Sequence, residues 1–176
     1  MTIDVFDTLA RHIPEIAHEW THLTTRELRL AAPDAPCRDA LLSVLGGLLD
    51  MARSPSRATV TALVEQATAD GVCQRAAGVP DHSLLTEYTL LREAVWRTAR
   101  RHGAQLTELS AMLPLDLAVS TASRAALVGY YRQELDASGR IDEAVEKILR
   151  EVLALPLDRL GDGARAPSRP RPPQSH

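Results

Sequence analysis

The sequence has few aromatic residues, no long apolar run and only two cysteines. Aromatic residues make up 3% of the 176 residues, so leucine, alanine and valine must supply most of any hydrophobic core. No stretch approaches the roughly 18 consecutive apolar residues of a transmembrane helix, and residues 1–20 carry charges throughout, without the apolar centre of a signal peptide. We therefore expect a cytoplasmic protein that does not span a membrane.

The cysteine content and the charge exclude further classes. Cys37 and Cys73 stand far apart and in no spacing typical of a metal site, so a disulfide framework is not expected and each cysteine is interpreted as a small core residue. The formal net charge of −3 lacks the basic excess of a general nucleic-acid binder. No nucleic-acid partner is therefore expected.

Helix-forming residues with helical spacing are abundant. Alanine, leucine, arginine and glutamate favour helices, and β-branched residues rarely alternate with polar ones. The expected helices cover residues 4–30, 37–53, 54–77, 81–103, 106–135 and 140–155, with Ser54 as the expected cap of the third and Asp81 or Ser83 as that of the fourth. Pro14 is expected to kink the first helix or to begin its main part, and Pro114 to kink the fifth or split off a short piece. The predicted fold class is all-α, a bundle of about five to six helices.

The predicted organisation is a helical bundle over residues 1–135, an additional C-terminal helix within 136–157 and a tail over 158–176. The tail is rich in proline and arginine without an apolar pattern, so it is expected to be disordered. The C-terminal helix carries apolar residues at alternating spacings of four and three: Ile141, Val145, Ile148, Val152 and Leu155. Because this seam lasts only about two heptads, two interpretations stay open: a helix docked on the bundle, or a dimer or output helix.

One motif suggests catalysis, because residues 18–22 spell H-E-x-x-H. On a helix this spacing places His18 and His22 on one face, where zinc proteases hold their metal, with Glu19 as the base. Against this function, no third ligand and no strand stand out in the sequence. Trp20 also belongs to the expected apolar stripe, so the two histidines flank the core-facing line. A zinc-dependent metallohydrolase is therefore kept as the alternative function.

A basic cluster stands where the helix over 81–103 is expected to end: Arg97, Arg100, Arg101 and His102. Cations in this place complement the negative end of a helix dipole, and contact with an anion or a nucleic acid is the alternative. A transcription regulator is not favoured, because no helix-turn-helix pair with its glycine turn is evident.

Residues 84–92, LLTEYTLLR, contain an E-Y-x-x-L-R motif formed by Glu87, Tyr88, Leu91 and Arg92. This segment resembles the signature of the N-terminal domain of the RsbT co-antagonist RsbRD, a helical module of bacterial stress-signalling proteins and of some sensor kinases. Ile16 and Trp20 match the isoleucine–tryptophan spacing of that family's first helix. The resemblance extends over about residues 12–133.

The resemblance implies a helical bundle that receives an input and passes it to an output domain or a partner. Two departures weaken it: residues 69–75 keep Arg75 but lack a histidine that members often carry, and no kinase or anti-sigma-antagonist domain follows in the sequence. Glu87 and Arg92 are five residues apart, so each is expected to bond to another helix.

The main hypothesis is a non-enzymatic signal-sensing or regulatory domain of a bacterial stress or two-component-type pathway. It would act through contacts with a regulatory protein partner, with a homodimer formed through residues 141–155 as one form of that contact. Under this hypothesis no catalytic residue, cofactor or metal is expected.

Overall fold

The computed structural model describes residues 5–30, 34–103 and 109–157, which form eight α-helices and no strand. In chain order they are α1 (Val5–Arg11), α2 (Ile13–Leu28), α3 (Ala35–Arg53), α4 (Arg57–Ala76), α5 (Asp81–Arg101), α6 (Leu109–Tyr130), α7 (Arg132–Ala137) and α8 (Ile141–Leu153). The predicted all-α class is confirmed. The predicted tail, residues 158–176, lies outside the described residues.

The helices outnumber the predicted five to six because two expected segments divide. His12 separates α1 from α2, and Pro14 is the second residue of α2, where its missing N–H costs no helical hydrogen bond. Tyr131 separates α6 from α7, whereas Pro114 lies inside α6 and splits off no piece. The prediction that Pro14 begins a main helix is confirmed, and the one that Pro114 splits off a short helix is wrong.

Two helix starts also differ from the sequence pattern. The cap of α4 is Ser56 and not Ser54: its side chain accepts from the N–H of Thr59, and the hydroxyl of Thr59 accepts from the N–H of Ser56. The helix α5 begins after Pro80 without any side-chain cap, although Asp81 or Ser83 was expected to supply one.

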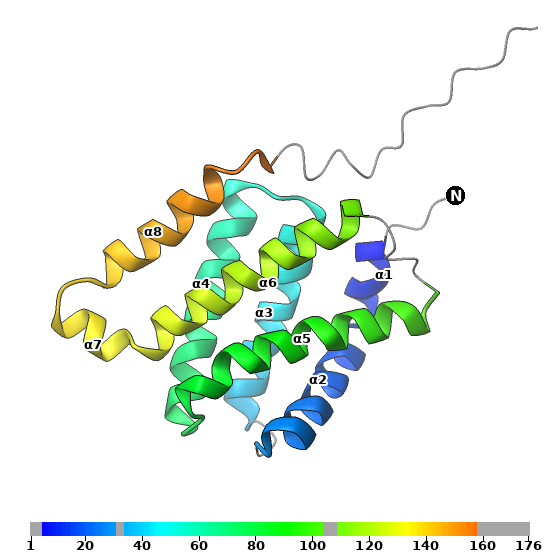
Figure 1. The fold of residues 1–176 in the computed structure, drawn as a ribbon, viewed down its shortest axis with the longest axis horizontal. Helices are drawn as coiled ribbons and strands as arrows, with labels where there is room; N and C mark the ends of the chain where they lie inside the picture. Colours follow the sequence, from blue (N-terminus) through cyan, green and yellow to red (C-terminus); the bar gives the residue numbers. More distant parts are fainter. Residues whose placement is uncertain (1–4, 31–33, 104–108, 158–176) are drawn as a thin grey trace, which may run out of the picture.

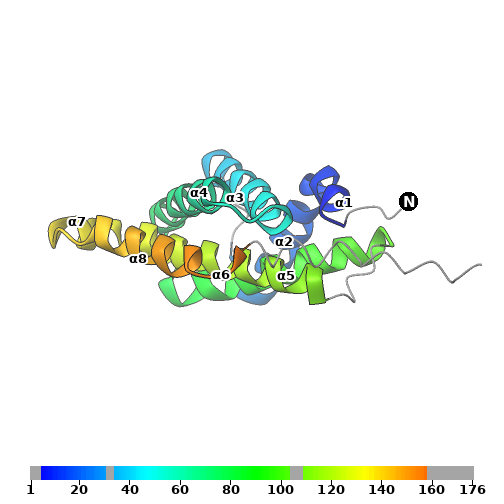
Figure 2. The same cartoon turned by 90° about the horizontal axis from the view of Figure 1, so that it is seen from above.

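The helices form two layers, and α6 lies in one of them and packs against the other (Figure 2). Figure 2 shows α3 and α4 side by side in one layer, with α5, α6 and α8 in the other. In Figure 1, α6 runs between α5 and α8, while α2 lies along α5 and α1 contacts α3 and α5. Among the described helices only α6 is long and apolar enough to cross a membrane by composition, with a mean hydropathy of 1.3 over its best window. Because α3, α4, α5 and α8 all pack against it, its apolar character is that of a core helix.

Small residues let α4 and α6 approach closely. A Cβ atom added at Gly71 would collide with the carbonyl oxygen of Ala126, and one added at Gly129 would collide with that of Thr68. The two backbones therefore touch where these glycines cross, a contact that no larger side chain would permit.

The helix α8 docks on its own chain, against α6 and α4. Ile148 and Val152 are buried there, Ile141 and Val145 are half-buried, and Leu155 follows the end of the helix and is exposed. The middle of the apolar seam is thus occupied within one chain, as the docked-helix interpretation expects. A dimer through this seam could use only the residues at its margins, Ile141, Val145 and Leu155, as contacts.

Cys37 and Cys73 form a disulfide that joins the start of α3 to the end of α4, with Cα atoms 5.6 Å apart. The expectation that they are not joined by a disulfide is wrong, whereas Cys37 is buried as expected and Cys73 is half-buried. The antiparallel α3–α4 hairpin brings together residues that are 36 apart in the sequence, and the spacing alone carries no sign of this. Because disulfides are rare in the reducing cytosol, the pairing removes one support of the cytoplasmic prediction.

Candidate functional site: a buried carboxylate pair

Three of the residues singled out in the sequence meet where α2 and α5 pack together. Glu87 and Tyr88 are neighbours on α5 and are buried, with 2% and 4% of their surface exposed. The indole N–H of Trp20, on α2, donates a hydrogen bond to the backbone carbonyl of Glu87 at 2.9 Å. Trp20 thereby fixes the position of α2 along α5 at the residue whose side chain enters the core.

The helix α4 supplies a second acid to this place. The hydroxyl of Tyr88 donates to Oδ2 of Asp70 at 3.0 Å, and Asp70 is as deeply buried as Glu87. Gln74, one turn further along α4, is buried too. The result is a polar cluster inside a leucine- and alanine-lined core, defined here as the buried carboxylate pair Asp70 and Glu87 with Tyr88 and Gln74.

The two carboxylates are poorly compensated. Within the described ranges 5–30, 34–103 and 109–157, Oδ1 of Asp70 and both side-chain oxygens of Glu87 are buried without a hydrogen-bond partner. The ion pairs found among those residues include neither acid. A charge buried without a cation is costly, so burial shifts both acids toward the neutral, protonated form.

The pKa values follow from this environment. Burial, reinforced by the charge of Asp70, raises the pKa of Glu87 from 4.5 to about 8. Burial raises the pKa of Asp70 to about 6, against the lowering effect of Tyr88 and Gln74. Burial and Asp70 also raise the pKa of the Tyr88 hydroxyl well above its ordinary value. Near neutral pH the favoured state therefore has Glu87 protonated beside a largely ionised Asp70.

The other two residues of the E-Y-x-x-L-R segment lie apart from this cluster. Leu91 is a fully buried core residue. Arg92 donates two hydrogen bonds to the carboxylate of Asp116 on α6, at 2.6 and 2.9 Å, and both side chains are about 41% exposed. The expectation of a bond to another helix holds for Arg92 and is wrong for the side chain of Glu87.

The H-E-x-x-H residues are arranged unfavourably for hydrolysis. His18 and His22 are exposed, whereas Glu19 lies on the α5 side and pairs with Arg97 and Arg101 at 3.2 and 2.5 Å. Arg101 and then Arg97 lower the pKa of Glu19. A carboxylate held by two guanidinium groups is a weak base, so this geometry does not favour the metallohydrolase alternative.

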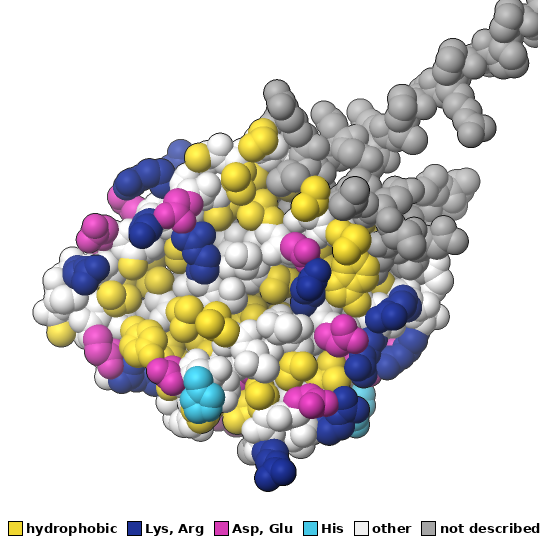
Figure 3. Space-filling model, in the orientation of Figure 1, with side chains coloured by type: hydrophobic (Ala, Val, Ile, Leu, Met, Phe, Trp, Pro, Cys, Tyr) yellow, Lys and Arg dark blue, Asp and Glu magenta, His cyan; other side chains and the backbone are white. Residues whose placement is uncertain are grey.

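The basic cluster at the end of α5 thus has partners on α2. Arg101 also pairs with Glu15, and His102 lies 2.8 Å from Oε2 of the same carboxylate. Arg100 lies farther out, 4.0 Å from Glu93. Acidic and basic side chains gather along the edge over α2 and α5 in Figure 3. Ion pairing between the two helices accounts for most of the cluster.

Sequence reasoning missed Asp70 and Gln74, although a signal was present. They stand seven and eleven residues after Leu63 and continue the stripe of Leu63 and Ala67, all of which are buried. Polar residues on an apolar stripe at helical spacing indicate a buried polar site, because such groups are seldom buried without a reason.

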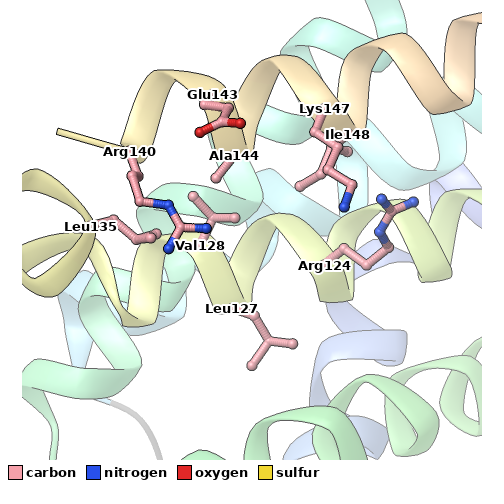
Figure 4. A pocket seen from close by; sticks show the side chains of 9 residues that line it. All are labelled: Arg124, Leu127, Val128, Leu135, Arg140, Glu143, Ala144, Lys147 and Ile148. Carbon is pink, nitrogen blue, oxygen red and sulfur yellow. The ribbon is translucent and has the colours of Figure 1, made fainter. Parts of the chain in front are cut away.

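A separate cavity of about 400 Å³ lies between α6 and the α7–α8 hairpin. Its lining, drawn in Figure 4, consists of Arg124, Leu127, Val128, Leu135, Arg140, Glu143, Ala144, Lys147 and Ile148. Arg124 is already paired with Glu151 of α8. The cavity is open and borders the docked helix, and it shares no residue with the buried carboxylate pair.

No known family model matches the chain, and no curated protein or solved structure matches it either.

Proposed function

We propose that the chain is a non-enzymatic regulatory domain that senses or relays a signal by changing the packing of α2, α4 and α5, and that it acts through contacts with a regulatory protein. The observation that carries the proposal is the buried carboxylate pair, in which three oxygens lack a partner among the described residues. It lies where α5 is bonded to α2 through Trp20 and to α4 through Tyr88. The resemblance of residues 84–92 to a bacterial stress-signalling module supports the same class of function.

The buried carboxylate pair affects the balance between a closed and a looser packing of the helices. An uncompensated buried acid costs free energy in the closed bundle and is relieved when the helices separate and water reaches it. The free energies of the closed packing and of a looser packing then differ by less than they would with an apolar core. A partner or ligand that prefers one packing shifts the population toward it in proportion to its differential affinity.

The test uses the full chain as bait, expressed at its native level in the source organism, with quantitative mass spectrometry of the captured proteins. We expect a kinase, a phosphatase or a sigma-factor regulator to be enriched, and its captured amount to change when Glu87→Gln removes the ionisable group. The matched control is Glu65→Gln on the exposed face of α4, which should capture the wild-type amount.

Failure has two forms. If no regulatory protein is enriched over an unrelated helical bait, the proposed function is wrong. If one is enriched equally by the wild type and by both variants, the partner contact stands and the role of the buried pair in it is refuted.

A further inference from the structure

Away from the buried pair, the start of α2 and the end of α5 bring two imidazoles and a carboxylate together. His12 immediately precedes α2, Glu15 lies in its first turn, and His102 follows the last residue of α5. The rings of His12 and His102 stack with centroids 3.7 Å apart, and Nε2 of His102 lies 2.8 Å from Oε2 of Glu15. One donor atom from each of the three residues lies within 4.8 Å of the others.

Hydrogen bonds to neighbouring groups hold His12 and Glu15 in place. Nδ1 of His12 lies 2.7 Å from the carbonyl oxygen of Thr8, so Nδ1 carries the proton and Nε2 keeps its lone pair. Oε1 of Glu15 accepts from Arg101 at 3.2 Å, which leaves Oε2 directed at His102. Contacts of this kind fix the tautomer and the orientation of ligands in metal centres.

The electrostatics permit a cation here. The nearest guanidinium, Arg101, is also held by Glu19 at 2.5 Å, so two carboxylates offset its charge. The side chains of Glu15 and His102 are 34% and 33% exposed, which leaves a path from solvent for an ion and for a further ligand.

We propose that His12, Glu15 and His102 bind one divalent transition-metal ion of the Zn²⁺ class, with at least one coordination position open to water. Two imidazoles and one carboxylate are a common ligand set of zinc, and imidazole ligands select Zn²⁺, Co²⁺, Ni²⁺ or Cu²⁺ over Mg²⁺ and Ca²⁺. The ion replaces the hydrogen bond between His102 and Glu15 and joins α2 to α5. This site is distinct from the H-E-x-x-H residues, and it does not depend on the proposed regulatory function.

The test is a titration of the purified full chain with ZnCl₂, without an affinity tag and without reductant, so that Cys37 and Cys73 stay paired. Calorimetry should show one ion per chain, and the thermal midpoint should rise with Zn²⁺ because the ion binds the folded state. His12→Ala, His102→Ala and the isosteric Glu15→Gln should each weaken binding by about 10-fold or more. The matched control is the double variant His18→Ala/His22→Ala, which should bind as the wild type does.

Three results would overturn the proposal. The first is a folded wild-type chain, verified by circular dichroism, that takes up no Zn²⁺. The second is binding that survives Glu15→Gln and His12→Ala but disappears in the His18→Ala/His22→Ala variant, which would move the site to the H-E-x-x-H residues. The third is equal binding of Mg²⁺ and Zn²⁺, which an imidazole site excludes.

Discussion

Two pairs of acids contrast with each other: Glu15 and Glu19 lie on α2, and Asp70 of α4 lies near Glu87 of α5. At the surface, Glu15 and Glu19 of α2 meet arginines of α5, and their pKa values are lowered, for Glu15 chiefly by His102 and for Glu19 chiefly by Arg101. In the interior, Asp70 and Glu87 meet no cation, and burial raises the pKa values of both. The same residue types on neighbouring helices thus titrate in opposite directions because one pair is solvated and paired while the other is neither.

The difference shows which pair governs the packing of the helices. Exposed ion pairs add little stability, because water already solvates the separated charges. A buried acid without a partner opposes packing as soon as it ionises, and this happens within the physiological pH range for Glu87. The interior pair is therefore expected to change the stability of the packing of α5 with pH more than the surface pair does.

The largest expected effect comes from Glu87→Gln, which removes the interior titration. Folding raises the pKa of Glu87, so the folded state keeps a proton that the unfolded state releases, and the free energy of unfolding falls as the pH rises from 4.5 to about 8. Across this pH range the free energy of unfolding should fall by about 2–4 kcal/mol less in the variant than in the wild type. Urea unfolding at several pH values across the window measures it.

The control for Glu87→Gln is again Glu65→Gln on the exposed face of α4, which should keep the wild-type dependence on pH. A smaller slope should remain in Glu87→Gln, confined to the range between 3.8 and about 6 where Asp70 titrates. If the free energy of unfolding of Glu87→Gln fell with pH up to about 8 as that of the wild type does, Glu87 would be solvated in the folded protein. The buried acids would then be compensated.

A smaller effect is expected from Tyr88→Phe, which removes the hydroxyl that donates to Asp70. Loss of this donor should lower the free energy of unfolding by about 1–3 kcal/mol at neutral pH, because a buried carboxylate is left without its hydrogen bond. It should also raise the pKa of Asp70 further, which a carboxyl-carbon NMR titration detects. The matched variant is Tyr131→Phe, which removes a hydrogen bond to Asp81 at the exposed surface and should cost less. Equal losses in the two variants would contradict the contrast between interior and surface.

The helices themselves were largely predictable from the sequence. Apolar residues at spacings of three and four, with Pro14 and the proline-containing breaks between segments, located most of the helical chain, because burial of one face is what stabilises a helix in a bundle. The exact helix starts were harder to predict, as Ser56 shows: Ser54 and Ser56 both offer a capping hydroxyl, and the surrounding structure selects Ser56.

Contacts between helices were harder to foresee. Of the adjacent glycines Gly46 and Gly47, only Gly47 faces a neighbour while Gly46 faces open space, and nothing in the sequence distinguishes them. The backbones of α4 and α6 touch at Gly71 and Gly129, and the sequence does not show that these two glycines face each other's helix. Trp20 and Tyr88 were singled out from the sequence, but their polar partners depend on the rotation of α2 and α4 against α5, which periodicity does not determine.

The smallest expected effect comes from Arg97→Met, which breaks the surface pair with Glu19 and Glu93 while keeping an apolar stem of similar length. At neutral pH the loss of stability should be smaller than that of Tyr88→Phe, and it should shrink further in high salt because the pair is screened. Its pH dependence should have the opposite sign to that of Glu87: the pKa of Glu19 is lowered, so the stabilisation is present above 4.5 and disappears as the pH falls through the lowered pKa. Urea unfolding at low and high salt, at neutral and acidic pH, separates the two behaviours. A loss that persists in high salt and does not shrink with acidification would mean that Arg97 stabilises the bundle by packing and not by charge.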